Sequence, residues 1–564
     1  MIANGDSWTS APGEAGGGYR SLTISHHCDA HHTMKIVIAD KLPESAVAPL
    51  REPGWTIDAR AGRTAEALAG DLADADALIV RSATRVTRAL IDAAPRLRLI
   101  ARAGTGVDNV DVEAASARGI VVMNAPGANS VSVAEHTMAL MLALARSVPA
   151  ADASMKRGEW DKGRFTGVEL RGKTLGLAGL GRVGQEVAVR AHAFGMDVIA
   201  HDPFIASVVA ADLGVTLVPL DELFGRSDYL SLHLPSVPAT RHLVNADRLT
   251  GCRPGLRIVN TARGELVDEA ALAAAIREGR VAGAALDVFE VEPPPHSGLL
   301  SLPQVITTPH IAASTREAQE LVGTETASAV RDFLKDGIIR NAVNFPSLSV
   351  EEHKRLRPYI ELAVRLGSLI GQLGDARTQA VGVCYYGDLA GTTGQILGSA
   401  VLVGLFRPIV GPSITPVNAR TVAATRGVEL TESWSSRPRR FTNLISVTLR
   451  TSQGERWVEG VAFEDGSLRL VQLNGVDIEA PLEGTLLVIT NRDQPGVIGE
   501  VGSILGRHGV NIATFALGRG PDGAVGVVNI DEEPTESAMS AVTAQALQEI
   551  RAVPAVRAAH HVRL

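Results

Sequence analysis

Short apolar runs separated by stretches of helical spacing make up the chain from Met34 to about residue 315. The apolar runs predict strands, which lie at residues 35–40, 77–81, 97–102, 120–123, 215–218, 229–232, 257–260, 283–288 and 305–308. A longer apolar stretch at 132–147 predicts a helix after the first four runs. Strands that alternate with helices are typical of parallel, doubly wound sheets, so we expect an α/β fold with two such lobes.

The pattern changes after residue 345. A helical stretch at 356–373 precedes alternating strands separated by turns, such as the run 381–386. Farther on, a strand breaks at Pro495 and another begins at Val510. The helix predicted between them has apolar residues on one face, namely Val497, Ile498, Val501, Ile504 and Leu505. The last part of the chain is therefore expected to form two further α+β domains.

Composition and charge narrow the class of protein. At about 150 residues per domain, a chain of 564 residues is expected to hold three to four domains. The net charge is −8 and no basic tract stands out, so we expect no nucleic-acid partner. No uninterrupted apolar run of about 18 residues is present, and we expect no membrane segment. Cys28, Cys252 and Cys384 are too widely spaced for a disulfide framework, which fits a cytoplasmic protein.

Residues 1–33 are rich in Gly, Ser and Ala and lack the apolar core of a secretory signal. The segment contains side chains that can bind metals, namely His26, His27, Cys28, His31 and His32. Without a scaffold to hold them, a disordered extension before a natural start at Met34 is the favoured interpretation, and we expect no metal cofactor.

A glycine-rich turn, Gly-Leu-Gly-Arg-Val-Gly, follows the apolar run 175–178 and opens a helical stretch. Gly179 permits the tight turn, Gly181 lets the backbone approach a pyrophosphate, and Gly184 lets the helix pack on the strand. Asp202 ends the next apolar run. A carboxylate there accepts hydrogen bonds from the ribose hydroxyls of NAD and repels the extra phosphate of NADP. The sequence therefore predicts NAD as the cofactor.

Three chemically distinctive side chains follow strands of the second lobe: Arg263, Glu292 and His310. Ligands of doubly wound sheets bind at the carboxyl ends of the strands, beside the expected nicotinamide. For oxidation of a 2-hydroxy acid, an arginine can hold the substrate carboxylate in a bidentate fork, and a histidine can take the hydroxyl proton as hydride leaves. A glutamate can orient that histidine and stabilise its protonated form. Each residue alone could be an ordinary ion pair, loop acid or buried histidine; together they favour catalysis.

Several motifs carry a resemblance to a known family. They are Val-Arg-Ser-Ala-Thr at 80–84, Arg-Ala-Gly-Thr-Gly-Val-Asp-Asn-Val-Asp at 102–111, Asn-Thr-Ala-Arg-Gly-Glu-Leu-Val-Asp-Glu at 260–269, Ala-Leu-Asp-Val-Phe-Glu-Val-Glu-Pro-Pro at 285–294 and Thr-Pro-His-Ile-Ala-Ala-Ser-Thr at 308–315. With these motifs, residues 34 to about 345 resemble the D-isomer-specific 2-hydroxyacid dehydrogenases. The resemblance implies an NAD-dependent enzyme in which Arg263, Glu292 and His310 are the catalytic residues.

The resemblance also implies contacts with both ligands. Those to the cofactor come from Gly179, Gly181, Arg182, Val183, Gly184, Asp202, His233, Pro235, Thr240, Thr261, Ala262, Asp287 and Ala313, with Asp287 on the nicotinamide side. Those to the substrate come from Arg81, Ser82, Arg102, Gly104, Gly106 and Asn124. Because a phosphate dianion needs cationic donors, Arg81 and Arg102 favour 3-phospho-D-glycerate as the substrate, with Lys41 a weaker candidate. Its oxidation to 3-phosphohydroxypyruvate is the first step of phosphorylated L-serine synthesis.

The same resemblance divides the chain into domains. We expect a substrate-binding domain at 34–132 and 316–345, an NAD-binding domain at 133–315, an intervening domain at 346–482 and a ferredoxin-like ACT domain at 483–564. An ACT domain can sense amino acids, and the resemblance places L-serine as an effector at Asn491, Asp493 and Asn511. An ACT fold used only for assembly is the alternative. Family likeness also suggests a homo-oligomer, most simply a tetramer.

Two other functions fit the same motifs. One is another D-2-hydroxyacid dehydrogenase, such as a hydroxypyruvate or glyoxylate reductase. The other is a non-enzymatic NAD-sensing protein of the same fold, because such proteins retain the Arg263, Glu292 and His310 set. The ACT-like tail favours a biosynthetic enzyme, since feedback by an amino acid suits such a pathway.

Overall fold

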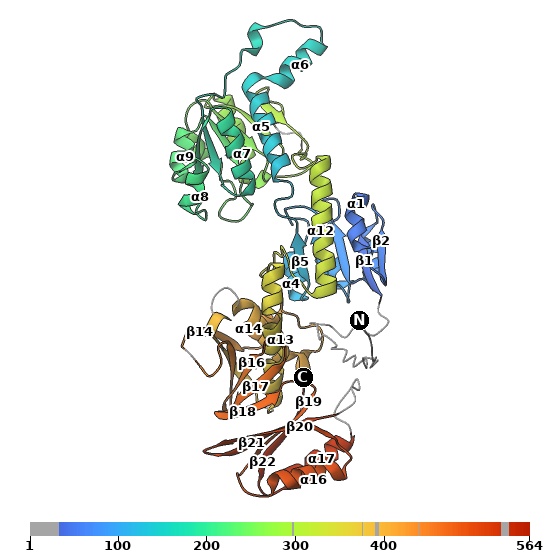
Figure 1. Cartoon of the computed structure of the whole chain (residues 1–564). Helices are drawn as coiled ribbons and strands as arrows, with labels where there is room; N and C mark the ends of the chain where they lie inside the picture. Colours follow the sequence, from blue (N-terminus) through green and yellow to red (C-terminus); the bar gives the residue numbers. More distant parts are fainter. Residues whose placement is uncertain (1–32, 296–297, 375, 390–393, 438, 532–540) are drawn as a thin grey trace, which may run out of the picture. The chain divides into compact units, whose positions relative to one another are not determined.

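The computed structural model describes residues 33–295, 298–374, 376–389, 394–437, 439–531 and 541–564. The predicted disordered extension and its histidine and cysteine cluster lie outside these residues, apart from Thr33. The described chain forms four sheets, coloured in sequence from blue to red in Figure 1. The first two belong to one compact unit, Met34–Arg331 with Asn341–Phe345, and the last two to a second unit made chiefly of Pro346–Leu564.

The first sheet has five parallel strands in the order β2-β1-β3-β4-β5. They are β1 (Met34–Ile38), β2 (Trp55–Ala59), β3 (Ala77–Val80), β4 (Leu99–Arg102) and β5 (Val121–Asn124), joined by α1 (Glu44–Val47), α2 (Ala65–Leu72), α3 (Arg88–Asp92) and α4 (Val112–Ala117). The four strands predicted here are confirmed. The edge strand β2 was not predicted, because its half-exposed residues form no apolar run.

The second sheet has seven parallel strands in the order β12-β11-β10-β9-β6-β7-β8. They are β6 (Thr174–Ala178), β7 (Asp197–His201), β8 (Thr216–Leu217), β9 (Tyr229–Leu232), β10 (Leu256–Asn260), β11 (Val281–Leu286) and β12 (Val305–Thr307). The direction of winding reverses between β6 and β9, and doubly wound sheets bind ligands at such a point. The predicted doubly wound lobe is therefore confirmed.

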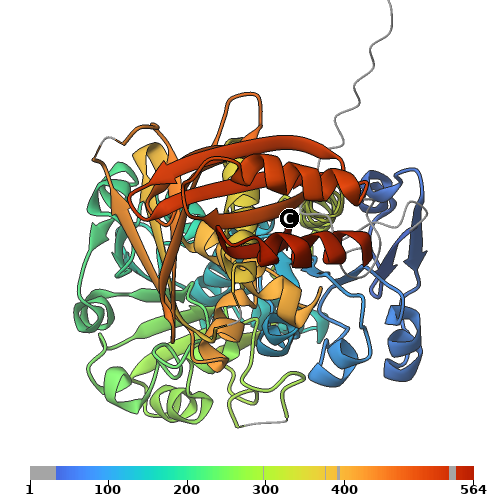
Figure 2. The ribbon, with the colours of Figure 1, turned by 90° about the horizontal axis from the view of Figure 1, so that it is seen from below.

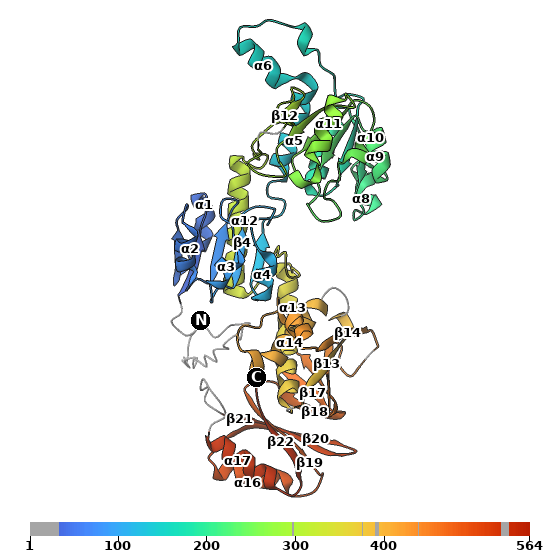
Figure 3. The ribbon, with the colours of Figure 1, turned by 180° about the vertical axis from the view of Figure 1, so that it is seen from behind.

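Helices cover both faces of the second sheet (Figures 1 and 3). They are α5 (Ser130–Arg146), α7 (Arg182–Ala193), α8 (Ser207–Asp212), α9 (Leu220–Arg226), α10 (Ala246–Thr250) and α11 (Glu269–Arg277). The helix α6 (Val148–Lys156) projects away from the sheet, and single turns lie at η2 (Gly163–Phe165) and η3 (Gly264–Leu266). One buried cluster packs Leu177, Val187 and Tyr229 with α5, and another packs Leu230, Ile258 and Leu272. These two cores hold the carboxyl ends of the strands in fixed positions.

After α12 (Arg316–Asp336) the chain returns to the first sheet. Val343 N–H donates to the carbonyl of Val122 at 2.9 Å, and the Asn344 side chain accepts from Val122 N–H at 2.9 Å. The segment Asn341–Phe345 thus lies beside β5. Residues Asp332–Arg340 belong to the second unit, so the chain changes units three times between Arg331 and Pro346.

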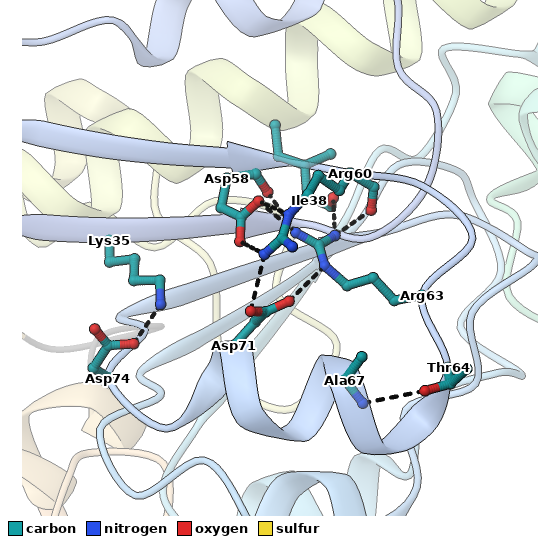
Figure 4. Close-up of polar contacts among 9 residues, drawn as sticks. All are labelled: Lys35, Ile38, Asp58, Arg60, Arg63, Thr64, Ala67, Asp71 and Asp74. Carbon is teal, nitrogen blue, oxygen red and sulfur yellow. Dashed lines mark hydrogen bonds and ion pairs between the residues drawn. The ribbon is translucent and has the colours of Figure 1, made fainter.

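An ion-pair cluster joins the ends of β1 and β2 to α2 (Figure 4). The Arg63 side chain is 5% exposed and lies between the carboxylates of Asp58, at 2.6 Å, and Asp71, at 2.8 Å. It also donates to the carbonyls of Ile38 and Asp58 at 2.9 and 3.2 Å and to that of Arg60. Arg60 pairs with the same two carboxylates from the solvent side. The Arg63 cation thus links the paired ends of β1 and β2 to α2.

The second unit contains a six-stranded sheet and a four-stranded sheet (Figures 1 and 2). The first comprises β13 (Thr378–Tyr386), β14 (Glu429–Ser435), β15 (Leu444–Thr451), β16 (Gly454–Ala462), β17 (Leu468–Leu473) and β18 (Val476–Pro481), with α13 (Val350–Gln372), α14 (Gly394–Val410) and α15 (Ala419–Thr425). The second comprises β19 (Thr485–Asn491), β20 (Ile512–Gly520), β21 (Gly523–Ile530) and β22 (Val556–Arg563), with α16 (Val497–Arg507) and α17 (Ala541–Ala552). The latter follows the βαββαβ order expected of an ACT domain.

One expectation for this unit needs correction. The apolar helix α14 was not predicted, because it is buried almost all round and lacks an amphipathic period. The helix α16 was predicted with five apolar residues on one face, and of these the Ile498 side chain is 46% exposed. Val497, Val501, Ile504 and Leu505 do pack against the four-stranded sheet.

Candidate active site

The glycine-rich loop has the backbone geometry that each glycine predicts. Gly179 has φ +98°, and a Cβ there would lie 2.5 Å from the carbonyl oxygen of His233. A Cβ on Gly184 would lie 2.3 Å from the Gly179 carbonyl, so the helix packs closely on the loop. Gly181 caps α7 and has open space where a Cβ would be, which leaves the helix N-terminus accessible to a phosphate.

Asp202 stands at the carboxyl end of β7, beside this loop. Its Oδ2 accepts from Leu180 N–H and its Oδ1 from Phe204 N–H, both at 2.9 Å. These bonds fix the carboxylate at the loop and leave lone pairs on both oxygens for a ribose. The residues present fit a bound NAD at the pyrophosphate and the adenosine ribose.

The predicted histidine and glutamate come together. His310 Nδ1 lies 2.8 Å from Glu292 Oε2, and Phe289 N–H donates to Glu292 Oε1 at 3.2 Å. The His310 and Glu292 side chains are 53% and 38% exposed, so both are open to solvent. Because a carboxylate only accepts, Nδ1 carries the proton and Nε2 is left as the basic nitrogen.

Arg263 follows β10, the strand next to β11 in the sheet, and its side chain contacts Asp108 of the first lobe. Its Nε donates to Asp108 Oδ2 at 3.0 Å, and its Nη1 donates to the Ala262 carbonyl at 2.7 Å. A Cβ on Gly106 would lie 2.0 Å from Nη2, so only glycine leaves room for this guanidinium. Asp108 was not predicted as a site residue, although it lies in the quoted motif at 102–111.

A second guanidinium lies close by. Burial lowers the pKa of Arg102, and the positive charge of Arg263 lowers it further, as does that of Arg81. The Nε of Arg102 is buried without a hydrogen-bond partner, and a Cβ on Gly104 would lie 1.7 Å from Nη1. Arg81 donates to the Lys41 carbonyl at 3.2 Å. The carboxylates of Asp108 and Asp40 offset part of this repulsion, and a bound anion would offset more of it.

Other residues predicted to contact the substrate or cofactor lie in the surrounding loops. Asn124 Nδ2 donates to the Thr105 carbonyl at 2.5 Å, and Thr240 Oγ1 donates to the Pro235 carbonyl at 2.6 Å. Arg182 donates to the Pro126 carbonyl and packs against Gly127, in the segment that leads into α5. No polar side-chain contact is described for Ser82, whose role stays a prediction.

His233 follows β9 and faces the loop of Gly179. Its Nε2 lies 2.8 Å from Ser231 Oγ, and burial lowers its pKa to about 4. The imidazole is therefore neutral near pH 7. Of the smaller predicted cofactor contacts, Thr261 is buried, and Val183, Ala262 and Ala313 are half-buried.

Asp287 follows β11 and is bonded to the loop that carries His310. Its side chain is 0% exposed, and its oxygens accept from Thr308 Oγ1, Ile311 N–H and Ala312 N–H. Its backbone carbonyl accepts from His310 N–H at 2.8 Å. Asp287 therefore holds the loop that carries His310, and its contact on the nicotinamide side stays a prediction.

The three predicted effector residues lie in the four-stranded domain. Asp493 and Asn511 are exposed: Asp493 Oδ1 lies 3.5 Å from Arg519 Nε, and Asn511 donates to Asp531 at 2.5 Å. Asn491 is buried, and its amide donates to the carbonyl of Arg492 at 2.8 Å. An effector could reach Asp493 and Asn511 directly, but it could not reach the Asn491 side chain without a rearrangement.

Comparisons with known proteins agree with this geometry. Family models match for the NAD binding domain of D-isomer specific 2-hydroxyacid dehydrogenases at residues 138–312, the D-3-phosphoglycerate dehydrogenase intervening domain at 355–474, and the ACT domain at 485–550. A D-3-phosphoglycerate dehydrogenase of Methanocaldococcus jannaschii is 43% identical over 90% of this chain and 97% of its own length. The chain belongs to the D-3-phosphoglycerate dehydrogenase family. Another member, from Bacillus subtilis, is 38% identical over 88% of this chain and 94% of its own length.

Solved structures resemble the first compact unit of this family member. The TT0316 protein of Thermus thermophilus is 37% identical, with a TM-score of 0.51, over 55% of this chain and 100% of that one. A glyoxylate reductase from Paecilomyes thermophila is 31% identical with the same TM-score of 0.51, over 55% and 98%. Membership of the family and the matched NAD binding domain identify an NAD-dependent oxidoreductase.

Within the ranges given above, no group of three or more His, Cys, Asp or Glu side chains could hold a metal ion. None of the helices in those ranges is both long and apolar enough to cross a membrane.

Proposed function

We propose that this enzyme oxidises 3-phospho-D-glycerate to 3-phosphohydroxypyruvate with NAD, the first step of phosphorylated L-serine synthesis, in the cytoplasm. The observation that carries the substrate assignment is the group of Arg81, Arg102 and Arg263, in which the Nε of Arg102 is buried without a hydrogen-bond partner. Guanidinium groups are suited to bind a doubly charged phosphate and a carboxylate. Relatives named D-3-phosphoglycerate dehydrogenase, which align with this chain over almost their full length, support the assignment.

Different side chains bind the substrate, take up the proton and hold the cofactor. The Arg263 fork binds the substrate carboxylate in place of Asp108 and orients the hydroxyl carbon. His310 Nε2 takes the hydroxyl proton, and Glu292 stabilises the imidazolium that forms. A bound NAD supplies the hydride acceptor. Asp202 and the glycine loop hold its adenosine ribose and pyrophosphate, and the neutral His233 adds no charge beside them.

The phosphate role of Arg81 is tested by its removal. We expect Arg81→Ala to raise KM for 3-phospho-D-glycerate about tenfold or more, and KM for an unphosphorylated D-2-hydroxy acid much less, because a charge-assisted hydrogen bond contributes about 1.5–3 kcal/mol. Arg51→Ala is the matched control, since Arg51 lies on the same lobe, its side chain is 64% exposed, and it pairs with Glu44. Equal effects on both substrates would remove Arg81 from the phosphate site.

The two alternative functions predict different results in one assay. NADH formation is measured with a panel of D-2-hydroxy acids with and without phosphate. A preference for D-glycerate or glycolate would favour a hydroxypyruvate or glyoxylate reductase. Binding of NADH, seen by fluorescence, without turnover of any substrate would favour an NAD-sensing protein.

We propose L-serine as the effector of the ACT domain, bound at Asp493 and Asn511. The exposed carboxylate and amide have the chemistry to bind an ammonium and a carboxylate. Calorimetry is expected to show saturable heat with L-serine that Asp493→Ala abolishes. If the Asp493→Ala variant gives the same heat with L-serine, the serine site lies elsewhere. If neither protein gives heat, the domain does not bind serine and serves assembly alone.

We also propose a homo-oligomer, most simply a tetramer. On α6 and the loop after it, Val148, Met155 and Trp160 are 54%, 52% and 73% exposed. Apolar side chains gathered in this way favour contact with another copy of the chain. Light scattering should give a mass near four chains, and Trp160→Ser should lower it; a monomer at micromolar concentration would contradict the proposal.

A further inference from the structure

Helix α5 directs a row of polar side chains at the loops that carry the catalytic residues. The helix is largely apolar, yet Ser132, His136 and Thr137 each bond to a hydroxyl of another segment. Ser132 Oγ lies 2.7 Å from Thr315 Oγ1, and Thr137 Oγ1 lies 2.8 Å from Thr261 Oγ1. His136 Nε2 lies 3.1 Å from Thr308 Oγ1. These threonines precede Arg263 or flank His310, so one helix contacts both catalytic loops.

The contact of His136 continues into a chain of hydrogen bonds. Thr308 Oγ1 lies 2.5 Å from Asp287 Oδ1 and must donate to it, because the carboxylate carries no proton. The single hydroxyl proton is then used, so Thr308 accepts from His136, and His136 Nε2 carries a proton. The same nitrogen lies 3.5 Å from Asp287 Oδ1. His136 is thus the outer donor of a chain that ends on a buried carboxylate.

The carboxylate of Asp287 in turn fixes the backbone next to His310. It accepts from Ile311 N–H and Ala312 N–H at 2.9 Å each. Burial alone would raise the pKa of Asp287, but the hydrogen bonds from His136 and Thr308 lower it below its usual value, so the group stays ionised. An ionised carboxylate with no solvent exposure needs all of these donors.

His310 needs such a support because of its own backbone. Its φ is +52°, in the left-handed region that a non-glycine residue rarely adopts. Its imidazole is more than half exposed, and among the described residues only Glu292 is bonded to the ring. The loop backbone, rather than packing of the ring, therefore determines where Nε2 lies. A displacement of about 1 Å at such a position can cost about a hundredfold in rate.

We infer that His136 is a positioning residue for His310, acting through Thr308 and Asp287. The inference rests on the proposed function, in which His310 takes the proton. It does not make His136 catalytic, since the imidazole bonds to the loop and not to the reacting atoms. It predicts that loss of the His136 donor changes the chemical step and leaves cofactor binding intact.

The test compares two substitutions at one position. His136→Leu removes the donor at similar volume, and His136→Gln keeps a donor close to the place of Nε2. We expect His136→Leu to lower kcat about tenfold or more, with KM for 3-phospho-D-glycerate and Kd for NADH changed less than twofold. His136→Gln should recover most of kcat. A general loosening of the fold would instead raise Kd and KM together and would not be rescued.

A double-variant cycle identifies the path. Because Thr308→Val cuts the same chain, His136→Leu added to it should lower kcat little further. Glu135→Gln, at an exposed neighbouring position of α5, is the control and should leave kcat unchanged. Unchanged kcat in His136→Leu, or losses that simply multiply in the double variant, would overturn the inference.

A readout without turnover separates this inference from the proposed function. Modification of His310 by diethylpyrocarbonate, followed by mass spectrometry of its peptide, is expected to be several-fold faster in His136→Leu than in the unsubstituted enzyme. An equal rate would refute the positioning role even if the enzyme is active. A faster rate in a protein that does not turn over 3-phospho-D-glycerate would refute the proposed function alone.

Discussion

The two arginines in Figure 4, Arg60 and Arg63, carry the same charge but differ in burial. Replacing each in turn measures how much burial adds to the stability that an ion pair contributes. Arg60 and Arg63 contact the same two carboxylates, those of Asp58 and Asp71, but their side chains are 61% and 5% exposed. We expect Arg63→Met to destabilise the first sheet strongly and Arg60→Met to do so weakly. The two variants remove the same charge and retain a similar apolar stem.

The magnitude follows from the bonds that Arg63 makes. Removal of one member of a buried ion pair costs about 3–5 kcal/mol. Here Arg60 still neutralises both carboxylates, at 2.6 and 2.9 Å, which reduces that cost. Three carbonyls, of Ile38, Asp58 and Arg60, also lose a donor. We therefore expect a loss of about 2–3 kcal/mol for Arg63→Met. The exposed Arg60 is screened by solvent and its loss should be much smaller.

Hydrogen exchange measured by mass spectrometry suits this prediction, because a chain with several domains does not unfold in two states. Exchange at peptides covering β1 and β2 should quicken about 30- to 150-fold in Arg63→Met, since about 1.4 kcal/mol is a factor of ten. Peptides of the four-stranded domain provide an internal control in the other compact unit. Equal exchange in both variants would refute the reasoning that burial of the guanidinium decides its contribution.

Three further predictions concern the cofactor, the substrate loop and acid. Asp202→Ala should raise KM for NAD, because the adenosine ribose of NAD loses a hydrogen-bond acceptor. It should also reduce the enzyme's preference for NAD over NADP, because the carboxylate that repels the 2′-phosphate of NADP is gone. An unchanged ratio of kcat/KM for the two cofactors would contradict this role. Gly104→Ala should raise KM for 3-phospho-D-glycerate, because its Cβ would displace the Arg102 guanidinium, and an unchanged KM would place that guanidinium outside the site. The ion pairs of Asp58, first that with Arg60, lower its pKa from 3.8 to about 2. Its stabilisation is therefore complete above about pH 4 and is lost as pH falls toward 2. Asp58→Asn should flatten the acid dependence of exchange in β1 and β2 over that range, and an unaltered dependence would contradict the shift.

Much of the site could be read from the sequence, because the signals are local. Apolar runs show where strands end, and the carboxyl ends of parallel strands lie at the same edge of a sheet. Glu292 and His310, which follow two such strands, could therefore be expected to lie close together. The glycines of the dinucleotide loop likewise serve the predicted roles, since each role depends on the absence of one Cβ.

The features that sequence reasoning missed depend on contacts between distant segments. His136 lies in an apolar helix, and only the fold brings it to Thr308, 172 positions away. Nothing in the sequence around Asp108 indicates that its carboxylate pairs with Arg263, which lies 155 positions away. The hydrogen bonds that Asp287 accepts from Thr308, Ile311 N–H and Ala312 N–H also join segments more than 20 positions apart. Edge strand β2 and the all-apolar helix α14 lack the periodicity on which assignment relies.

The pairing of Arg263 with Asp108 has a consequence for the energetics of substrate entry. Because Asp108 is already the counter-ion of the Arg263 guanidinium, a substrate carboxylate that binds there replaces one anion with another. The net charge at the fork then changes little on binding, and recognition there depends on bidentate geometry rather than on long-range attraction. Affinity for an unphosphorylated 2-hydroxy acid is therefore expected to vary little with ionic strength, and the salt dependence of the phosphorylated substrate should come from its phosphate.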